Sequence, residues 1–576
     1  MITTTSAVPG QSQRRAGRLV DRPEPGRRWP EALAVAAGTL LITWQGSRLG
    51  RWIVDDAAIT FAYARSIDEG HGPVQQPGAE PVEGYSNPAW LALLVVGRRL
   101  GLFDRGAWFG VPDLVLFPKL LAVLCAAGIL LATAAAARPL VTRVWAATGL
   151  AGVLLAANSS FVAWMFSGLE NPLYALLAAV LAAVLVRAVA QDTLLTRRTA
   201  VTCGLLALGA ALTRPDGAVL AGAYPLLLLT RLRRPALPGL LRAAAYGIGA
   251  FVLPYALFLV LRRAEFGRWV PNTAVAKAQQ LPDLAAFART SGELLSFTGW
   301  PVVLLTVAVC AVAATRPGRP GPAVLAAVLV PLGLTLFAFG VLDPDWMGLY
   351  RFATPVWALG TMALALATVA LADRSAPRRR VLLAAAVAAS TVFSVVAQKE
   401  SADAFRDKPT LSLCTVVKRH GVLFNEQADR LGIGDASLLT PSLGGTLLTS
   451  KLKVHDLAGL TEPRIADYLA AGDIKGLQTY ALDELRPTFV HATDAWAEKT
   501  GMKKSLLTAK GYLPLYRTSD GGGAWVRAEA VRRPEQLPAA RAWTRQVLPT
   551  AVSPGERQEC GTQLTPGLTA AGAHWS

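Results

Sequence analysis

Two adjacent carboxylates, Asp55 and Asp56, follow the first apolar run of the chain in the stretch WIVDDAAITF. Like charges side by side near a low-dielectric boundary raise one another's pKa, so their placement indicates proton handling or ligand holding. A carboxylate at this point could deprotonate the hydroxyl of an acceptor. The alternative is the solvated end of a helix, which is the commoner setting for an acidic pair.

Three cations stand at corresponding ends of later apolar runs and could hold a phosphate. They are Arg214 in LTRPDG, Lys277 in PNTAVAK and Arg351 in DWMGLYRF. Arginine offers a bidentate fork to phosphate, and lysine offers a point charge. Each cation alone is more typical of a side chain that reaches the membrane interface from a helix end. Together with the carboxylates, the three predict a site for an anionic headgroup, where a phosphate leaving group needs no general acid.

A third group of polar residues supplies the donors and acceptors that grip sugar hydroxyls. It comprises Glu83, Tyr85 and Asn87 in VEGYSNPAW, with Glu170 and Asn171 in SGLENP. Each Asn-Pro pair is also typical of a turn before a helix. The two aspartates and Glu83 could take up a divalent cation, but their spacing specifies none, so we predict no metal site.

The elements that position these residues are apolar helices. The 576-residue chain is 53% hydrophobic and 17% charged, with a mean hydropathy of +0.38, which is typical of a polytopic α-helical membrane protein. Eleven runs approach the roughly 20 residues that cross a bilayer. They cover residues 32–45, 114–136, 144–166, 172–190, 200–212, 217–229, 243–261, 300–314, 323–342, 355–371 and 381–396.

Basic residues gather in every second connection between these runs, so the net charge of +18 indicates membrane topology and no nucleic-acid partner. They are Arg14, Arg15, Arg18, Arg22, Arg27 and Arg28, then Arg138, Arg143, Arg187, Arg197, Arg198, Arg231, Arg233, Arg234, Arg316, Arg319, Arg374, Arg378, Arg379 and Arg380. The positive-inside rule places these connections in the cytoplasm and the polar motifs outside. We therefore predict a multi-pass plasma-membrane protein with a cytoplasmic N-terminus and an outer C-terminal region.

Three parts follow from this layout: a basic cytoplasmic tail (1–30), a transmembrane domain (31–397) with a long outer loop (51–113), and an extracytoplasmic α/β domain (398–576). Residues 88–103 of the loop are apolar but too few to span, which predicts an interfacial helix with Trp90, Arg98 and Arg99 near the headgroups. In the outer domain, SDGGG between two β-prone runs predicts a hairpin. Cys414 and Cys560 fall in the same domain and could form a disulfide or both be free.

Seven motifs between Trp52 and Pro355 carry a family resemblance. They are DDAAITFAYAR, GHGPV, VEGYSNPAW, SGLENPL, LTRPDG, VPNTAVAK and DWMGLYRFATP, with a weak continuation in VHDLAGLTEPRIADYL. In this order they resemble the GT-C class of polyprenyl-phosphate-sugar-dependent membrane glycosyltransferases, in particular the terminal β-(1→2)-arabinofuranosyltransferase family of the mycobacterial cell wall and its bacterial relatives. EGYSN and DPDW are more similar to the broader bacterial group, which keeps a hexose such as mannose or glucose open beside arabinofuranose.

The resemblance implies that Asp55 or Asp56 is the catalytic base. It also implies a decaprenyl-phosphate sugar as donor and an envelope polysaccharide or glycolipid as acceptor, and it leaves a divalent cation open without implying one. We therefore predict an inverting transferase at the outer membrane face, in which Arg214, Lys277 and Arg351 hold the leaving phosphate. A transporter of lipid-linked precursors would show internal repeats and polar mid-membrane positions, which the sequence lacks. A non-catalytic envelope-assembly protein would tolerate loss of the acidic pair.

Overall fold

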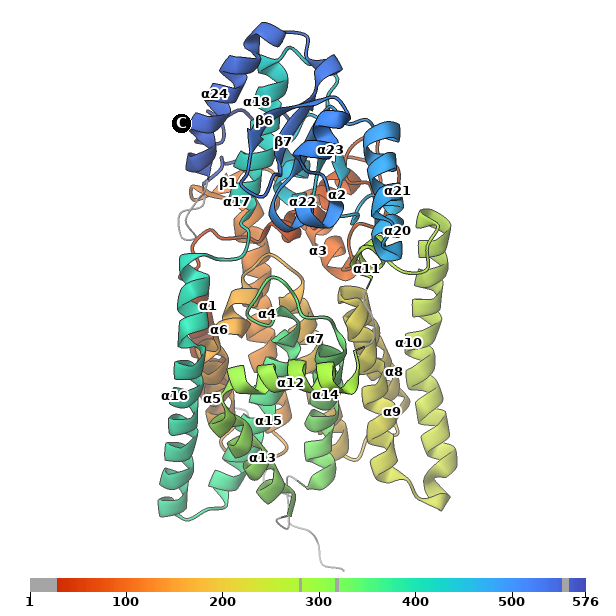
Figure 1. Ribbon diagram of the computed structural model, residues 1–576. Helices are drawn as coiled ribbons and strands as arrows, with labels where there is room; N and C mark the ends of the chain where they lie inside the picture. The colour runs from red at the N-terminus through yellow and green to blue at the C-terminus, as the bar shows by residue number, and fades with distance from the viewer. Residues whose placement is uncertain (1–27, 279–281, 316–320, 552–558, 576) are drawn as a thin grey trace, which may run out of the picture.

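A layer of long apolar helices carries a mixed α/β domain at one end in the computed structural model (Figure 1). The structure describes residues 28–278, 282–315, 321–551 and 559–575. Within these ranges, six helices are long and apolar enough to cross a membrane, or eight if each of two bent helix pairs counts as one span. The chain is thus a multi-pass membrane protein, and the count of eleven spans stays a prediction. Most of the basic tail, with Arg316 and Arg319, lies outside the described residues.

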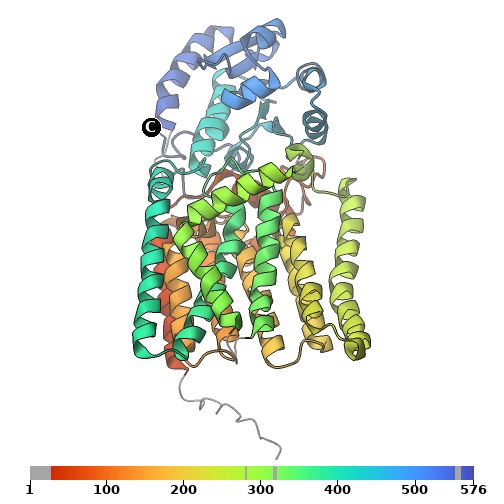
Figure 2. The ribbon, with the colours of Figure 1, turned by 60° about the horizontal axis from the view of Figure 1, so that its bottom comes forward.

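The helical layer contains every one of the eleven predicted runs. Its helices are α1 (Trp29–Ser47), α4 (Asp113–Ala137), α5 (Val144–Ala157), α6 (Ser159–Met165), α7 (Asn171–Ala190), α8 (Arg197–Thr213), α9 (Ala223–Leu228), α10 (Leu237–Phe266), α12 (Leu284–Thr298), α13 (Trp300–Thr315), α14 (Pro322–Val341), α15 (Thr354–Asp373) and α16 (Pro377–Asp407), with a 3₁₀ segment η2 (Pro215–Gly222) before α9. The α5–α6 pair bends by 84° and the α12–α13 pair by 94°. Figure 2 shows α10 at one edge of the layer and α16 at the other.

Small residues let neighbouring helices of this layer approach closely. A Cβ atom added to Gly152 of α5 would lie 2.7 Å from the Cα atom of Gly38 in α1, so this crossing requires glycine. Lipid tails are as apolar as the side chains, and helices in a membrane therefore associate through close packing at such small residues.

Ion pairs hold together the end of the layer that lies away from the domain. Arg138, just after α4, lies 2.9 Å from Glu31 of α1, and Arg143 lies 3.7 Å from Asp373 at the end of α15. These basic connections therefore share one end of the molecule, as the alternation of charge along the sequence predicts.

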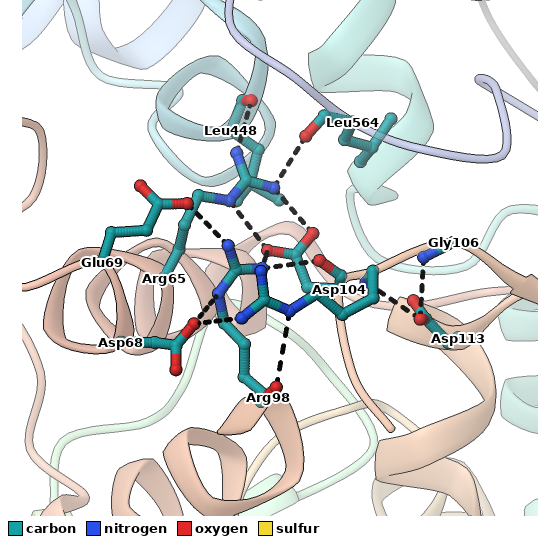
Figure 3. Close-up of polar contacts among 10 residues, drawn as sticks. Arg65, Asp68, Glu69, Arg98, Asp104, Gly106, Asp113, Leu448 and Leu564 are labelled. Carbon is teal, nitrogen blue, oxygen red and sulfur yellow. Dashed lines mark hydrogen bonds and ion pairs between the residues drawn. The ribbon is translucent and has the colours of Figure 1, made fainter. Parts of the chain in front are cut away.

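The predicted outer loop lies between the helical layer and the α/β domain (Figure 1). It forms α2 (Asp55–Asp68), α3 (Pro88–Arg99) and the short strands β1 (Ala107–Trp108) and β2 (Val111–Pro112). Trp90, Arg98 and Arg99 of α3 were predicted to lie near the lipid headgroups, and for Trp90 and Arg98 this prediction was wrong. Trp90 is buried and donates to the carbonyl of Gly168 (3.1 Å), and Arg98 is buried among carboxylates of α2 and of Asp104 (Figure 3). Of the three, only Arg99 is exposed, and Leu93 and Val96 of the same helix are exposed as well.

A five-stranded sheet forms the centre of the α/β domain, in the order β4-β3-β5-β7-β6. Its strands are β3 (Ser437–Thr440), β4 (Lys453–Asp456), β5 (Phe489–Ala492), β6 (Tyr512–Arg517) and β7 (Gly523–Arg527). Strands β3, β4 and β5 run parallel, whereas β7 pairs antiparallel with β5 and β6. The β6–β7 pair confirms the hairpin predicted at SDGGG.

Short helices complete the α/β domain around this sheet, and a disulfide ties Cys560 to the first of them. The helices are α17 (Leu413–Val416), α18 (Leu423–Arg430), α19 (Gly444–Thr449), α20 (Pro463–Ala471), α21 (Ile474–Thr479), α22 (Asp494–Thr500), α23 (Lys504–Ala509) and α24 (Leu537–Val547). Cys414 and Cys560 are joined, with their Cα atoms 5.2 Å apart. Helix α16 continues to Asp407, so the domain boundary predicted near Gln398 falls within a helix.

Candidate active site

A pocket of about 160 Å³ opens where α2 meets the domain-side ends of the helical layer; we call it the site pocket. Seven of the ten predicted site residues line it: Asp56, Tyr85, Asn87, Glu170, Arg214, Lys277 and Arg351. Asp55, Glu83 and Asn171 do not. Segments that are up to about 300 positions apart in the sequence therefore meet at one point, next to the α/β domain.

Asp55 is turned toward the α/β domain. Its Oδ1 accepts a hydrogen bond from the backbone nitrogen of Gly445 (2.7 Å), and its Oδ2 accepts one from Gly444 (3.0 Å). A Cβ atom on Gly444 would collide with the backbone oxygen of Asp55, so glycine permits this contact. Burial raises the pKa of Asp55 to about 8, while its two hydrogen bonds act in the opposite direction. Asp55 thus connects α2 with the start of α19.

Asp56, the next residue, lines the site pocket and is half-buried. Within the described ranges, its carboxylate has neither a hydrogen-bond donor nor an ion-pair partner. Burial raises its pKa, and the positive charges of Arg351 and Lys277 partly offset this effect. Asp56 is therefore a carboxylate with an elevated proton affinity and free lone pairs facing a cavity, which is the condition a general base needs.

Two guanidinium groups form another part of the wall, and both lie over the ring of Phe352. Arg214 is 4.4 Å from the ring centroid and Arg351 is 4.8 Å from it. Nη1 of Arg214 donates to Glu170 (2.9 Å) and its Nε donates to Asp216 (2.9 Å). Nε of Arg351 lies 2.6 Å from Asp345. Carboxylates thus fix the orientation of both arginines before any ligand arrives.

Lys277 ends α11 (Asn272–Lys277) and completes the cationic part of the pocket. No acidic group among the described residues lies within ion-pair distance of its ammonium group. The side chain is accessible to solvent, yet protein atoms crowd around it. The loss of hydration, and then the charge of Arg351, lower its pKa. A bound anion would offset the repulsion between Lys277 and Arg351. Among the described residues that line the site pocket, Lys277 and Asp56 are the two charged groups without a close partner.

Glu170 and Asn87 connect the outer loop with the start of α7. Nδ2 of Asn87 donates to Oε2 of Glu170 (2.8 Å), whose Oε1 receives the hydrogen bond from Arg214. Oδ1 of Asn87 accepts from the hydroxyl of Thr60 (3.3 Å). Tyr85 lies beside them and packs its ring edge-on against Tyr63, with 5.0 Å between the ring centroids.

The remaining two predicted residues support the pocket from behind. Glu83 is buried, and Arg262 of α10 supplies the ion-pair partner that a buried carboxylate requires (2.6 Å). Nδ2 of Asn171 donates to the backbone oxygen of Arg351 (2.9 Å) and to Thr354 (3.0 Å). These two residues hold the segments that carry the pocket residues.

Two acidic residues of the site, Asp216 and Asp345, had no role in the sequence-based prediction. Asp216 belongs to the motif RPDG, two positions after Arg214, and Asp345 belongs to the motif DPDW, six positions before Arg351. The loop before Arg351 also has a special backbone, since Leu349 and Tyr350 adopt positive φ angles of 44° and 48°. Ser160 and Trp164 hold this loop by donating to the carbonyl of Leu349.

Among the residues that the structure describes, no three His, Cys, Asp or Glu side chains are grouped to hold a metal ion. Glu83 lies in its ion pair with Arg262, apart from the two aspartates.

Comparisons with known proteins identify the architecture. No family model matches the sequence. The structure is similar to the oligosaccharyltransferase AglB from Archaeoglobus fulgidus (TM-score 0.51, 10% identity, 87% of this chain and 75% of that one). It is also similar to ArnT from Cupriavidus metallidurans (TM-score 0.52, 14% identity, 87% and 98%). The chain has the GT-C fold. This GT-C fold confirms the predicted class, a polytopic helical membrane protein with a C-terminal domain.

A short segment of the GT-C chain also matches a curated protein. Sixty-nine residues are 42% identical to the terminal β-(1→2)-arabinofuranosyltransferase of Mycobacterium tuberculosis, which is 12% of this chain and 11% of that protein. The match thus spans about a ninth of the length of that relative.

Proposed function

We propose that this chain is an inverting glycosyltransferase of the plasma membrane, which transfers a sugar from a polyprenyl-phosphate donor to a hydroxyl of an envelope glycan. The observation that carries the proposal is the juxtaposition of one unpaired carboxylate, Asp56, with Lys277 and the guanidinium of Arg351 in one small pocket. A base and an anion-holding group are what such a transfer requires. The alternating basic connections support an outward-facing site pocket.

In the proposed reaction Asp56 takes the proton of the acceptor hydroxyl. The oxygen then attacks the anomeric carbon of the donor sugar while the bond from that carbon to the phosphate oxygen breaks. Polyprenyl phosphate leaves with the bonding electrons, and the proton on Asp56 is later lost to solvent. Because one displacement occurs with no covalent enzyme intermediate, the configuration at the anomeric carbon inverts.

The cations divide the work of holding the phosphate. Among the described residues, Lys277 has no close counter-ion and Arg351 has one carboxylate partner, Asp345, so both retain charge for the donor. Arg214 shares its charge between Glu170 and Asp216 and mainly orients Glu170. Charge-assisted bonds strengthen as negative charge develops on the leaving group, which stabilises the transition state more than the bound donor.

The donor sugar proposed first is arabinofuranose, and it is supported by the segment similar to the mycobacterial enzyme and by the order of the motifs. The motifs EGYSN and DPDW support a hexose such as mannose as the second candidate. Tyr85, Asn87 and Glu170 line the pocket and supply hydrogen-bonding groups for the hydroxyls of either sugar.

The test is transfer by the purified full chain in nanodiscs, supplied with decaprenyl-phosphate arabinofuranose or decaprenyl-phosphate mannose and an arabinan acceptor. We expect Asp56→Asn to lower kcat by about 10²- to 10⁴-fold, because the neutral amide cannot take the proton. Asp55→Asn is the matched control and should remain active. Full activity of Asp56→Asn would contradict the proposed mechanism, and absence of transfer from both donors would contradict the proposed function.

A further inference from the structure

A second and larger pocket lies between α2 and the α/β domain. It has a volume of about 760 Å³, and we call it the domain pocket. Its lining includes Gln75, Lys453, His455, Glu462, Tyr480 and Thr565. The volume falls within the range of roughly 300–1,000 Å³ of ligand-binding sites, and it greatly exceeds that of the site pocket.

The two pockets share a thin wall made of two chain segments. Val82 and Thr461 line the domain pocket, whereas Gly84 and Leu460, one or two residues away, line the site pocket. The hydroxyl of Tyr63 donates to the carbonyl of Val82 (2.6 Å) and fixes the first segment. A ligand that extends over this wall would have its reacting end in the site pocket and the rest in the domain pocket.

The second segment of this wall is fixed from the side of the site pocket. Nδ2 of Asn272 in α11 donates to the carbonyls of Gly459 (2.7 Å) and Leu460 (2.9 Å). This segment belongs to VHDLAGLTEP, the motif of the α/β domain that the proposed reaction leaves without a role. The same motif places His455 and Glu462 in the domain pocket.

The lining of the domain pocket is polar and directional. Glu462 accepts a hydrogen bond from the hydroxyl of Tyr480 (2.9 Å), and its other oxygen lies 3.4 Å from Nδ1 of His455. Gln75 is 8% exposed, and its Oε1 has no hydrogen-bond partner among the described residues. A buried acceptor without a donor is costly, so a ligand that carries hydroxyl groups would be stabilised there.

The charges of the lining largely neutralise one another. Arg65 and Arg98 both contact Asp104, and Arg98 also contacts Glu69 (Figure 3). Lys451 pairs with Asp429. Lys453 and Glu80, which are exposed in the lining and have no ion-pair partner among the described residues, carry opposite charges. The arrangement favours a neutral ligand that is recognised by many hydrogen bonds.

We propose that the domain pocket binds a neutral oligosaccharide, namely the part of the acceptor glycan beyond the reacting sugar. This inference rests on the proposed function. On this inference the chain is a transferase that prefers long acceptors, because only a long acceptor can reach the domain pocket.

The test uses the full chain in nanodiscs, with arabinofuranose and mannose hexasaccharides and the matching disaccharides as probes in calorimetric titration and as acceptors in transfer. The wild type should bind one hexasaccharide at least about tenfold more tightly than its disaccharide. Gln75→Leu removes the buried amide, and Thr565→Trp fills the exposed rim. Both should lose this preference and retain disaccharide use. Thr562→Trp is the matched control, because Thr562 is equally exposed on the same segment but does not line the domain pocket.

Equal affinity of the wild type for long and short probes, or failure of both hexasaccharides to bind, would overturn the inference. So would a preference for long probes that survives in Gln75→Leu and Thr565→Trp. The outcomes also separate the two proposals. Hexasaccharide binding without any sugar transfer would refute the proposed function alone, whereas transfer that ignores acceptor length would refute this inference alone.

Discussion

Helix α2 has a cluster of charged residues at each end, and the two clusters differ in how their charges are matched. Near its C-terminal end, Nε and Nη2 of Arg65 donate to the two carboxylate oxygens of Asp104 at 2.7 Å each. Arg98 joins the same carboxylate and also Glu69 (Figure 3). We call this group, together with Asp68, the Arg65 cluster. At the N-terminal end, Asp56 and Lys277 have no close counter-ion among the described residues.

The difference separates stability from ligand binding. Charges in the Arg65 cluster are satisfied by the protein, and Arg65 also donates to the carbonyls of Leu448 and Leu564, so the cluster joins α2 to two parts of the α/β domain region. Breaking such a buried group leaves a charge without a partner. Unmatched charges in the site pocket instead cost folding free energy and become favourable only when a ligand supplies the complement.

The largest effect is expected from breaking the Arg65 cluster. Arg65→Ala should lower the free energy of unfolding by about 3 kcal/mol, because Asp104 loses one of its two guanidinium partners and two backbone carbonyls lose a donor. Chemical denaturation in nanodiscs measures this change. The control is Arg105→Ala, which removes a partly exposed partner of Asp68 and should cost at most about 1 kcal/mol. Equal losses in the two variants would show that the Arg65 cluster has no special structural role.

The second effect removes a charge from the site pocket. Lys277→Met should lower sugar transfer by about 10²-fold, because a charge-stabilising donor at the leaving phosphate is lost. The free energy of unfolding should not fall, since no described residue forms a hydrogen bond or ion pair with this ammonium. Transfer and denaturation are measured on the same preparation, with Lys475→Met, an exposed lysine of α21, as control. A loss of stability that matches the loss of transfer would erase the contrast between the two clusters.

The third effect distinguishes the neighbouring aspartates. Asp55→Asn should lower the free energy of unfolding by about 1–2 kcal/mol, because an amide cannot accept from both Gly444 and Gly445 without turning its nitrogen toward a donor. Thermal denaturation of Asp55→Asn and Asp56→Asn checks this. Asp56→Asn should show no such loss. A reversed order of stability would mean that Asp56, and not Asp55, joins α2 to the domain.

The smallest effect is a shift in pH dependence. Burial raises the pKa of Asp56, so transfer should decline as pH falls through this raised value, at a higher pH than for an ordinary carboxylate. Because Lys277 lowers the pKa of Asp56, Lys277→Met should move this decline to still higher pH. Profiles of kcat against pH measure the shift, and Lys475→Met should leave them unchanged. A shift to lower pH in Lys277→Met would contradict the assignment of Asp56 as the base.

The same raised pKa has a consequence for stability. The folded state holds the proton of Asp56 more tightly than the unfolded chain does, so this residue contributes least to stability once the pH exceeds its folded pKa. Asp56→Asn should therefore raise the free energy of unfolding most at high pH, as denaturation across a pH series would reveal.

Much of the architecture was predictable because it depends on local patterns. Each apolar run lies on one or two helical segments, and SDGGG forms the β6–β7 hairpin, since hydropathy and turn residues act over short stretches of chain. Residues 88–103 show the limit of such patterns. Their apolar run is too short to span a membrane and predicted a lipid interface, but the partners of Arg98 are carboxylates of Asp68 in α2 and of Asp104, and only the folded chain brings them together.

The sequence by itself determined a polytopic helical protein, the end of the helical layer at which its polar motifs meet, and seven of the residues that line the site pocket. The tertiary structure decided which of two adjacent aspartates faces that pocket. Neighbouring side chains on a helix point about 100° apart, so only one of them can face a given cavity. Which one does so depends on the close approach of Gly444, about 390 residues away, which receives Asp55 and leaves Asp56 free.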